Sequence, residues 1–223
     1  MDILAQKLHK LGVSDVLIRW ILALLDTRRC QMQFGKWKSQ IFPVSSGLPQ
    51  GSPLSSVLFN VYTADLIVEL GSTGTKPYTF VDDIIISVEG DTPVQAVEQL
   101  QQASNSLCDW TRNNRMSIQP DKACWMLVTL SHVDRSVFIV TYGGGTVPQV
   151  NSVTCLGVVM DKRMKMVDHI HHLRVKASKS LPLLRYAAAQ NVQQKSLAKL
   201  MTATVCSRTD YGIHLVPGNA KQP

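Results

Sequence analysis

The sequence lacks the patterns of disulfide-bonded, zinc-binding and membrane-spanning proteins. Its five cysteines are an odd number, lie far apart and include no C-x-x-C pair, which argues against a disulfide framework and a zinc ribbon. The longest apolar runs, such as residues 13–25, contain charges and are too short to span a bilayer. No signal peptide is recognised at the start. We therefore expect an intracellular protein, nuclear or cytoplasmic, with no membrane partner.

Histidines are scattered along the chain, and their only cluster is His169, His171 and His172. His169 and His172 could share a helix face as metal ligands. No motif of Cys, Asp or Glu accompanies them, so solvated or helix-capping histidines are the favoured interpretation.

Acidic residues are few in the last quarter of the chain. From Asp161 onward eleven lysines and arginines face three aspartates, a net charge of +8, whereas residues 1–160 carry twelve basic and thirteen acidic residues, a net charge of −1. This asymmetry indicates a C-terminal segment that faces a polyanion. A solvated, charge-rich helical face is the alternative.

Hydrophobic spacing and turn residues predict an α+β protein. Helices are expected over residues 3–11, 14–25 with Ser14 as a cap, 53–70, 93–113, 169–189 and 193–211. Hairpins are expected over residues 30–44 and 78–88, and strands over 125–130, 137–142, 147–150 and 156–160. Helices and strands do not alternate strictly, which favours the α+β class over α/β.

Two adjacent carboxylates, Asp82 and Asp83, stand between runs of strand-forming residues. An uncompensated charge inside a sheet would be costly, so either water at a hairpin tip or a divalent cation must satisfy them. Asp-Asp is also ordinary turn chemistry between two strands. Both interpretations remain open from these residues alone.

Several short motifs follow one another along the chain. They are Gly47-Leu48-Pro49-Gln50-Gly51-Ser52-Pro53-Leu54-Ser55, Leu58-Phe59-Asn60, Ala64-Asp65-Leu66, Phe80-Val81-Asp82-Asp83, Trp110 with Asn113 and Asn114, Asp121-Lys122, Cys155-Leu156-Gly157-Val158 with His169-Ile170, Leu183-Leu184-Arg185, and Asp210-Tyr211-Gly212. Together they resemble reverse transcriptases of non-LTR, LINE-like retrotransposons. Val81 replaces the usual Ala of the aromatic-x-Asp-Asp signature, and Met166 stands where the family frequently has Trp.

The resemblance implies a right-hand polymerase. It would place partial fingers and a palm, an antiparallel sheet packed on helices, in residues 1–160. A basic, helical thumb would occupy residues 161–215 and a tail residues 216–223. The implied partners are an RNA template, a DNA primer and deoxynucleoside triphosphates.

The resemblance also implies which residues would act. Asp82 and Asp83 would bind Mg²⁺ (or Mn²⁺), because joining a 3′-hydroxyl to an α-phosphate uses two ions about 3.5–4 Å apart. Lys122 would neutralise or protonate the leaving pyrophosphate, although a surface lysine without a role fits equally well. Leu156 and Gly157 would contact the primer.

The loop before the third predicted helix would contact the template and the incoming nucleotide. Its implied contact residues are Gly47, Pro49, Gln50, Gly51 and Ser52. Glycine lets the backbone approach a base or sugar closely, and the Gln50 amide offers a donor and an acceptor. A plain helix-initiating turn would explain Gly51, Ser52 and Pro53 without Gln50.

The resemblance starts just after the family's first catalytic motif, which carries another metal-binding Asp. Neither Asp2, at a terminus, nor Asp65, on a helix packed for other reasons, is a convincing replacement. The chain by itself is therefore expected to polymerise little or nothing, and an uncovered sheet edge is expected to cause self-association. A non-catalytic RNA- or DNA-binding remnant, and a fold in which Asp82-Asp83 is only a turn, are the competing hypotheses.

Overall fold

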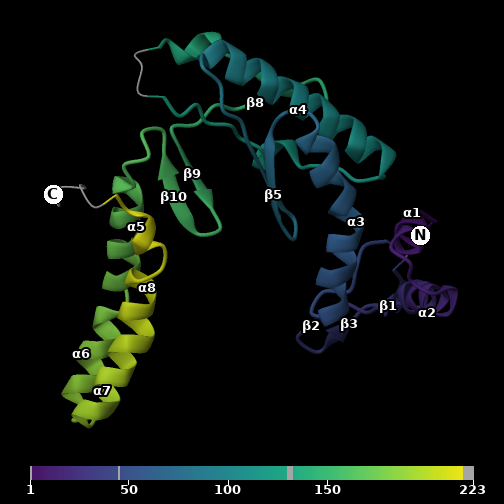
Figure 1. Ribbon diagram of the computed structural model, residues 1–223. Coiled ribbons are helices and arrows are strands. Elements are labelled where there is room, and N and C mark those ends of the chain that lie inside the picture. Colours follow the sequence, from purple (N-terminus) through teal and green to yellow (C-terminus); the bar gives the residue numbers. More distant parts are fainter. Residues whose placement is uncertain (1, 45, 130–132, 218–223) are drawn as a thin grey trace. The chain divides into compact units, whose positions relative to one another are not determined.

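The computed structural model describes residues 2–44, 46–129 and 133–217, which divide into a unit ending at Ile118 and a unit starting at Gln119 (Figure 1). Each unit combines helices with short two-stranded antiparallel sheets. The predicted α+β class is therefore confirmed. Residue 130 of a predicted strand and residues 218–223 of the predicted tail lie outside the described residues.

Four helices form the first unit: α1 (Asp2–Lys10), α2 (Asp15–Asp26), α3 (Pro53–Gly71) and α4 (Pro93–Asn113). Apolar residues spaced by three and four along α1 and α2 meet one residue of α3 in a buried core: Leu4, Leu8, Ile18, Ile21, Leu25 and Leu58. Ser14 occupies the N-cap position of α2, but its hydroxyl makes no capping hydrogen bond, contrary to the prediction. Thr92 does cap α4, because its Oγ1 accepts from the Gln95 amide at 3.2 Å.

The strands of the first unit pair locally. The predicted hairpin over residues 30–44 consists of two short pairs, β1 (Arg29–Cys30) with β4 (Phe42–Pro43) and β2 (Gln33–Phe34) with β3 (Trp37–Lys38). The hairpin of the two carboxylates pairs β5 (Lys76–Phe80) with β6 (Asp83–Ser87). It lies alongside α3, and α4 packs on the same helix (Figure 1).

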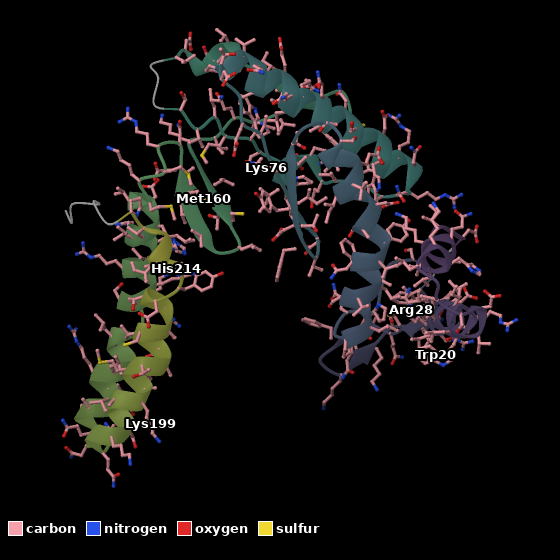
Figure 2. The ribbon with its side chains drawn as sticks, viewed as in Figure 1. Trp20, Arg28, Lys76, Met160, Lys199 and His214 are labelled. Carbon is pink, nitrogen blue, oxygen red and sulfur yellow. The ribbon has the colours of Figure 1, made fainter. Side chains whose placement is uncertain are left out.

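Apolar side chains remain exposed on the helices of this unit. Trp20 on α2 is 58% exposed (Figure 2), and Val68 on α3 is 74% exposed. By length and hydropathy α3 is the single described helix that could cross a membrane, and only 22% of its apolar window is buried. Within its unit this helix nevertheless packs against α1, α4 and β5, and its Leu58, Leu66 and Leu70 side chains are buried. Its contacts are those of a helix that organises a protein core.

The second unit begins with the 3-10 turn η1 (Pro120–Lys122) and contains two ribbons. One pairs β7 (Val140–Tyr142) with β8 (Gly145–Val147), and the other pairs β9 (Ser152–Cys155) with β10 (Val158–Asp161). The strand predicted from residue 125 is absent among the described residues 125–129, where Trp125 forms only an isolated bridge to Gln149.

The C-terminal segment is helical. Its elements are α5 (Val167–Ser178), α6 (Leu181–Ala189), α7 (Gln194–Met201), the π-helical turn η3 (Thr202–Cys206), α8 (Ser207–Thr209) and the 3-10 turn η4 (Ile213–Leu215). The helix predicted over residues 169–189 is interrupted, because Pro182 has no amide hydrogen for the carbonyl of Ser178. In Figure 1 α7 and α8 run beside α6 and α5, so the segment folds back on itself.

Candidate functional site

The tip of the β5–β6 hairpin presents two carboxylates to solvent. Phe80 pairs with Asp83, which leaves Val81 and Asp82 as a two-residue turn. Val81 has φ +52, a left-handed conformation that is costly for a β-branched residue. Asp82 is exposed at the tip, and Asp83 is exposed at the start of β6. The predicted hairpin is thus confirmed, with an unusual backbone at the residue that precedes the two acids.

The two faces of this hairpin differ in exposure. Tyr78, Phe80 and Asp83 lie on the exposed side, whereas Pro77 and Thr79 alternate with them and are half-buried. Among the described residues neither Asp82 nor Asp83 has a side-chain hydrogen bond or an ion pair. Free, exposed carboxylate oxygens are the ligand type that Mg²⁺ prefers, so the donor chemistry of this tip fits the ion.

The tip supplies two acids and no further ligand. Across the described parts of the chain, no group of three or more His, Cys, Asp or Glu side chains is placed to hold a metal ion. The described portion of the site therefore offers Asp82 and Asp83 as a pair.

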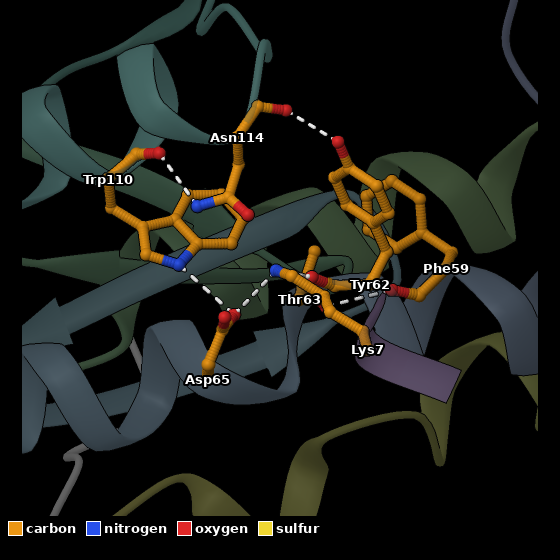
Figure 3. A network of polar contacts seen from close by, with 7 residues as sticks. All are labelled: Lys7, Phe59, Tyr62, Thr63, Asp65, Trp110 and Asn114. Carbon is orange, nitrogen blue, oxygen red and sulfur yellow. Dashed lines mark hydrogen bonds and ion pairs between the residues drawn. The ribbon is translucent and has the colours of Figure 1, made fainter. Parts of the chain in front are cut away.

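Asp65, the acid considered as a replacement ligand, is occupied elsewhere (Figure 3). Its Oδ1 lies 2.8 Å from Lys7 Nζ and accepts a hydrogen bond from Trp110 Nε1 at 3.1 Å. Lys7 Nζ also donates to the Tyr62 carbonyl and lies 4.7 Å and 4.9 Å from the ring centroids of Tyr62 and Trp110. Asp65 thus joins α1, α3 and α4, which confirms that its helix position serves packing.

Tyr62 extends the same network to the end of α4. Its hydroxyl donates to the Asn114 carbonyl at 2.5 Å, and Asn114 Nδ2 donates to the Trp110 carbonyl at 2.9 Å (Figure 3). Burial raises the pKa of the Tyr62 phenol, and the Asp65 charge adds to this effect while Arg115 opposes it. The phenol therefore keeps its proton and remains a donor.

The glycine- and proline-rich loop is held from both ends. Arg28, labelled in Figure 2, donates from Nη2 to the carbonyls of Ser46 and Gly47 at 3.1 Å and 2.7 Å, and from Nε to the Leu25 carbonyl at 2.9 Å. At the other end Ser55 Oγ donates to the Pro49 carbonyl at 2.6 Å. The Arg28 side chain therefore caps the C-terminus of α2 and also fixes the start of the loop.

The loop residues between these anchors differ in exposure. Gln50 and Gly51 are exposed, whereas Pro49 and Ser52 are half-buried. Gly47 and Gly51 have φ +72 and +81, and a Cβ on either would meet open space. Backbone conformation explains both glycines, and the space around them leaves room for close approach of a ligand.

Lys122 belongs to the second unit. It is exposed on η1, and its amide donates to the Gln119 carbonyl at 3.1 Å. The lysine therefore ends a 3-10 turn that begins with Pro120.

The primer-contact residues predicted from the sequence form the turn of the β9–β10 ribbon. Leu156 and Gly157 separate the paired residues Cys155 and Val158, with φ +47 and +82. Both positive angles define a type I′ turn, the usual two-residue connection of a hairpin. The Leu156 side chain is 44% exposed.

His169 is neither solvated nor a helix cap, so that interpretation was wrong for this residue. It is completely buried; its Nδ1 accepts from the Val159 amide at 3.3 Å and its Nε2 lies 3.2 Å from the Tyr211 carbonyl. Both ring nitrogens therefore have hydrogen-bond partners, as a polar side chain needs when it is buried in a protein core.

The segment after Asp161 carries the basic excess, in the turn before α5 and on the helices. The exposed basic residues are Arg163, Lys165, Arg174, Lys176, Lys179, Arg185, Lys195, Lys199 and Arg208. In the described part of this unit none of them has an acidic partner. Their positive charge is therefore available to a polyanion.

A glycine-rich loop that opens a helix, an acidic hairpin tip and a basic helical segment follow one another in this chain order, as expected of an α+β polymerase domain. Residues 1–160 match the family model described as reverse transcriptase (RNA-dependent DNA polymerase), and the chain belongs to this family.

Retrotransposon proteins of insects are similar to this chain. The RNA-directed DNA polymerase from mobile element jockey of Drosophila funebris is 24% identical over 212 residues, 91% of this chain and 23% of that protein. The probable RNA-directed DNA polymerase from transposon X-element of Drosophila melanogaster is 27% identical over 154 residues, 68% of this chain and 17% of that protein.

A third relative is the retrovirus-related Pol polyprotein from type-1 retrotransposable element R1 2 of Nasonia vitripennis, 24% identical over 143 residues, 62% of this chain and 35% of that protein. The chain thus spans between 17% and 35% of the length of these relatives. The predicted resemblance to LINE-like reverse transcriptases is confirmed, and the chain corresponds to part of an RNA-directed DNA polymerase.

Proposed function

We propose that the chain supplies the palm, part of the fingers and a thumb segment of an enzyme that copies RNA into DNA. The observation that carries this proposal is the pair of exposed, unpaired carboxylates of Asp82 and Asp83 at a hairpin tip in a member of the reverse transcriptase family. The right-hand division into residues 1–160, 161–215 and 216–223 is part of the same proposal.

Asp82 and Asp83 are proposed to hold Mg²⁺ or Mn²⁺. When bound, the metal would activate the primer 3′-hydroxyl and stabilise the leaving pyrophosphate. The chain's own contribution is to fix the carboxylates on a short, hydrogen-bonded ribbon, so that they need not reorganise to receive the ion. Lys122, on its turn, would stabilise the charge that develops on pyrophosphate.

The other proposed contacts with nucleic acid and nucleotide are made by residues of each unit separately. Gly47, Pro49, Gln50, Gly51 and Ser52 would contact the template strand and the incoming deoxynucleoside triphosphate. In the second unit Leu156 and Gly157 would contact the DNA primer. The basic helices would contact phosphates of the RNA–DNA duplex, which position a duplex without reading its sequence.

We propose that this chain is nearly inactive by itself. Two Mg²⁺ ions require more oxygen ligands than the two carboxylates of the hairpin tip, and Asp65 is held by Lys7 and Trp110. The outer edges of β5 and β6, which pair with no other described strand, and the exposed apolar residues of α2 and α3 support self-association. An intracellular location, where template and nucleotides occur, is proposed with it.

Binding of Mn²⁺ tests the metal site directly. Water-proton relaxation should detect Mn²⁺ bound to the wild-type chain, and Asp82→Asn and Asp83→Asn should each weaken this binding about tenfold or more. Asp91→Asn, an exposed acid of the same unit, is the matched control and should bind as wild type. Equal Mn²⁺ affinity in all four proteins would refute the site.

A non-catalytic nucleic-acid-binding role is the second candidate, because the exposed basic residues after Asp161 lack acidic partners among the described residues. Salt-dependent binding of a primer–template that Asp82→Ala leaves unchanged, without DNA synthesis in the presence of Mg²⁺, would favour this candidate. Robust Mg²⁺-dependent synthesis by the chain alone would instead show that the catalytic site is complete.

A further inference from the structure

The turn proposed to contact the primer is held by a residue 55 positions further along the chain. The hydroxyl of Tyr211 donates a hydrogen bond to the carbonyl of Leu156. The Tyr211 ring lies against the neighbouring residue, since a Cβ on Gly157 would come within 3.1 Å of Tyr211 Cε1. The positive φ of Gly157 favours glycine, and a side chain there would also press against the Tyr211 ring.

The strand that follows the turn is tied to the same residue through His169. The imidazole Nδ1 accepts from the Val159 amide, so the neutral ring carries its proton on Nε2 and donates to the Tyr211 carbonyl at 3.2 Å. His169 is completely buried. The carbonyl of Tyr211 and the backbone of β10 are thus joined by one side chain of α5.

Gly212 allows this close approach. A Cβ at Gly212 would lie 2.9 Å from His169 Nε2 and 3.0 Å from Val158 Cγ2, which is too close for any side chain. The backbone of residues 211–212 therefore packs directly on β10 and α5. The hydroxyl of Tyr211 is thus bonded to the turn of the β9–β10 ribbon, and its main-chain carbonyl is bonded to His169 of α5, which is itself bonded to β10.

Leu156 shows what this attachment does to the turn. It has φ +47, a left-handed conformation that is unfavourable for a residue with a side chain, and it nevertheless keeps its side chain 44% exposed. The hydrogen bond from Tyr211 is made to the carbonyl of this strained residue. It holds Leu156 in a conformation in which its side chain faces outward.

We propose that Tyr211, oriented by His169, is a positioning residue that sets the Leu156–Gly157 turn for contact with the primer strand next to its 3′ end. This inference rests on the proposed function of the turn. The inference goes further, because it assigns the positioning of the primer to the end of the C-terminal helical segment. Without this role the segment would contribute only general affinity for the duplex.

The test compares two ligands for each protein: a primer–template with a recessed 3′ end, and a closed dumbbell duplex of the same length that has no 3′ end. Wild type should prefer the recessed end. Tyr211→Phe keeps the ring against Gly157 and removes one hydrogen bond, so it should reduce this preference roughly two- to tenfold. Affinity for the closed duplex, which reports phosphate contacts, should stay within about twofold.

Two further variants complete the design. Tyr186→Phe is the matched control, because Tyr186 is 66% exposed on α6, and it should keep the wild-type preference. His169→Gln retains a donor near the Tyr211 carbonyl and should keep more of the preference than Tyr211→Phe. Amide hydrogen exchange at Gly157, Val158 and Val159 should be faster in Tyr211→Phe and unchanged in Tyr186→Phe.

The outcomes separate the two proposals. If wild type shows no preference for the recessed end, the proposed primer contact fails, and positioning fails with it, whatever the exchange rates show. If wild type shows the preference and Tyr211→Phe keeps it, only the role of Tyr211 is overturned. If Tyr211→Phe weakens both ligands by the same factor, Tyr211 is merely structural and the positioning role is overturned.

Discussion

The ammonium group of Lys7 is held between the rings of Tyr62 and Trp110 while it forms an ion pair with Asp65. The Lys7 side chain is only 12% exposed, whereas the Asp65 side chain is 54% exposed. This half-buried pair connects the first helix of the chain with α3 and α4. It explains why a charged residue occurs in the middle of an apolar helix.

Replacing Lys7 should therefore destabilise the first unit. Lys7→Met keeps the aliphatic stem and removes the charge, and should lower the free energy of unfolding by about 1–3 kcal/mol. With Asp65→Asn in a double-mutant cycle, the coupling energy should be about 1 kcal/mol, because the carboxylate is half exposed. Denaturant unfolding measures both quantities. Lys76→Met, which breaks the exposed pair with Glu89, is the control and should change little; equal effects would contradict the role assigned to Lys7.

Arg28 should determine the order of the glycine-rich loop. Arg28→Ala removes three hydrogen bonds to main-chain carbonyls and should lower the free energy of unfolding by about 1–2 kcal/mol. Amide exchange at Gln50 and Gly51 should accelerate. Arg29→Ala, at the exposed neighbouring residue, provides the comparison and should leave the loop amides unchanged. Identical exchange rates in the two variants would show that the loop does not depend on Arg28.

Because Val81 has a left-handed conformation, we expect that replacing it with glycine, next to the two acids, stabilises the protein. Val81→Gly removes the steric cost of φ +52, and after the entropy of glycine is counted it should raise the free energy of unfolding by about 1 kcal/mol. Val88→Gly, outside the positive-φ region, should lower it. Thermal and denaturant unfolding distinguish these outcomes, and a destabilised Val81→Gly would mean that the turn is not strained.

Asp161 should make the second unit sensitive to acid. Burial opposes ionisation of its carboxyl, but hydrogen bonds from the amides of Arg163, Lys165 and Met166 outweigh it and lower the pKa. A lowered folded-state pKa gives stability that is present above the unfolded pKa of about 4 and is lost as the pH falls through the folded value. Unfolding from pH 6 down to pH ~2 should show this loss. Asp161→Asn should flatten the profile, and Asp210→Asn should not; parallel profiles for wild type and Asp161→Asn would exclude the effect.

Much of the fold follows from local sequence signals. Pro53 and Pro93 each stand at the first turn of a long helix, and the Phe80–Asp83 hairpin was predictable from two apolar runs around a polar pair. The break at Pro182 was equally local, yet the basic, apolar pattern on both sides of the proline suggested one continuous helix. Residues 125–129 are apolar enough for a strand but lack a partner strand within the described residues, apart from the single bridge to Gln149.

The candidate site was predictable where a residue acts through its own chemistry and not where it acts through a distant partner. Asp82 and Asp83 are informative because adjacent acids between apolar runs need an explanation. Arg28 gave no such signal, and Tyr211 was noted only as part of the Asp210-Tyr211-Gly212 motif, with no indication of the residues it contacts. Their roles depend on carbonyls of Gly47 and Leu156, 19 and 55 residues away. Only the folded chain brings these groups together.

The π-helical turn Thr202–Cys206 lies where the neighbouring helix is interrupted. Ser180 Oγ donates to the Thr204 carbonyl at 3.1 Å, and Arg208 donates to Ser180 Oγ and to the Lys176 carbonyl. A wider turn inserts one residue into the helical repeat and so rotates everything after it by about 100°. That angular offset decides which way Arg208 and Tyr211 face. Deletion of one residue from this turn would thus point the side chains of Arg208 and Tyr211 away from their partners, although neither these two residues nor their partners would be changed.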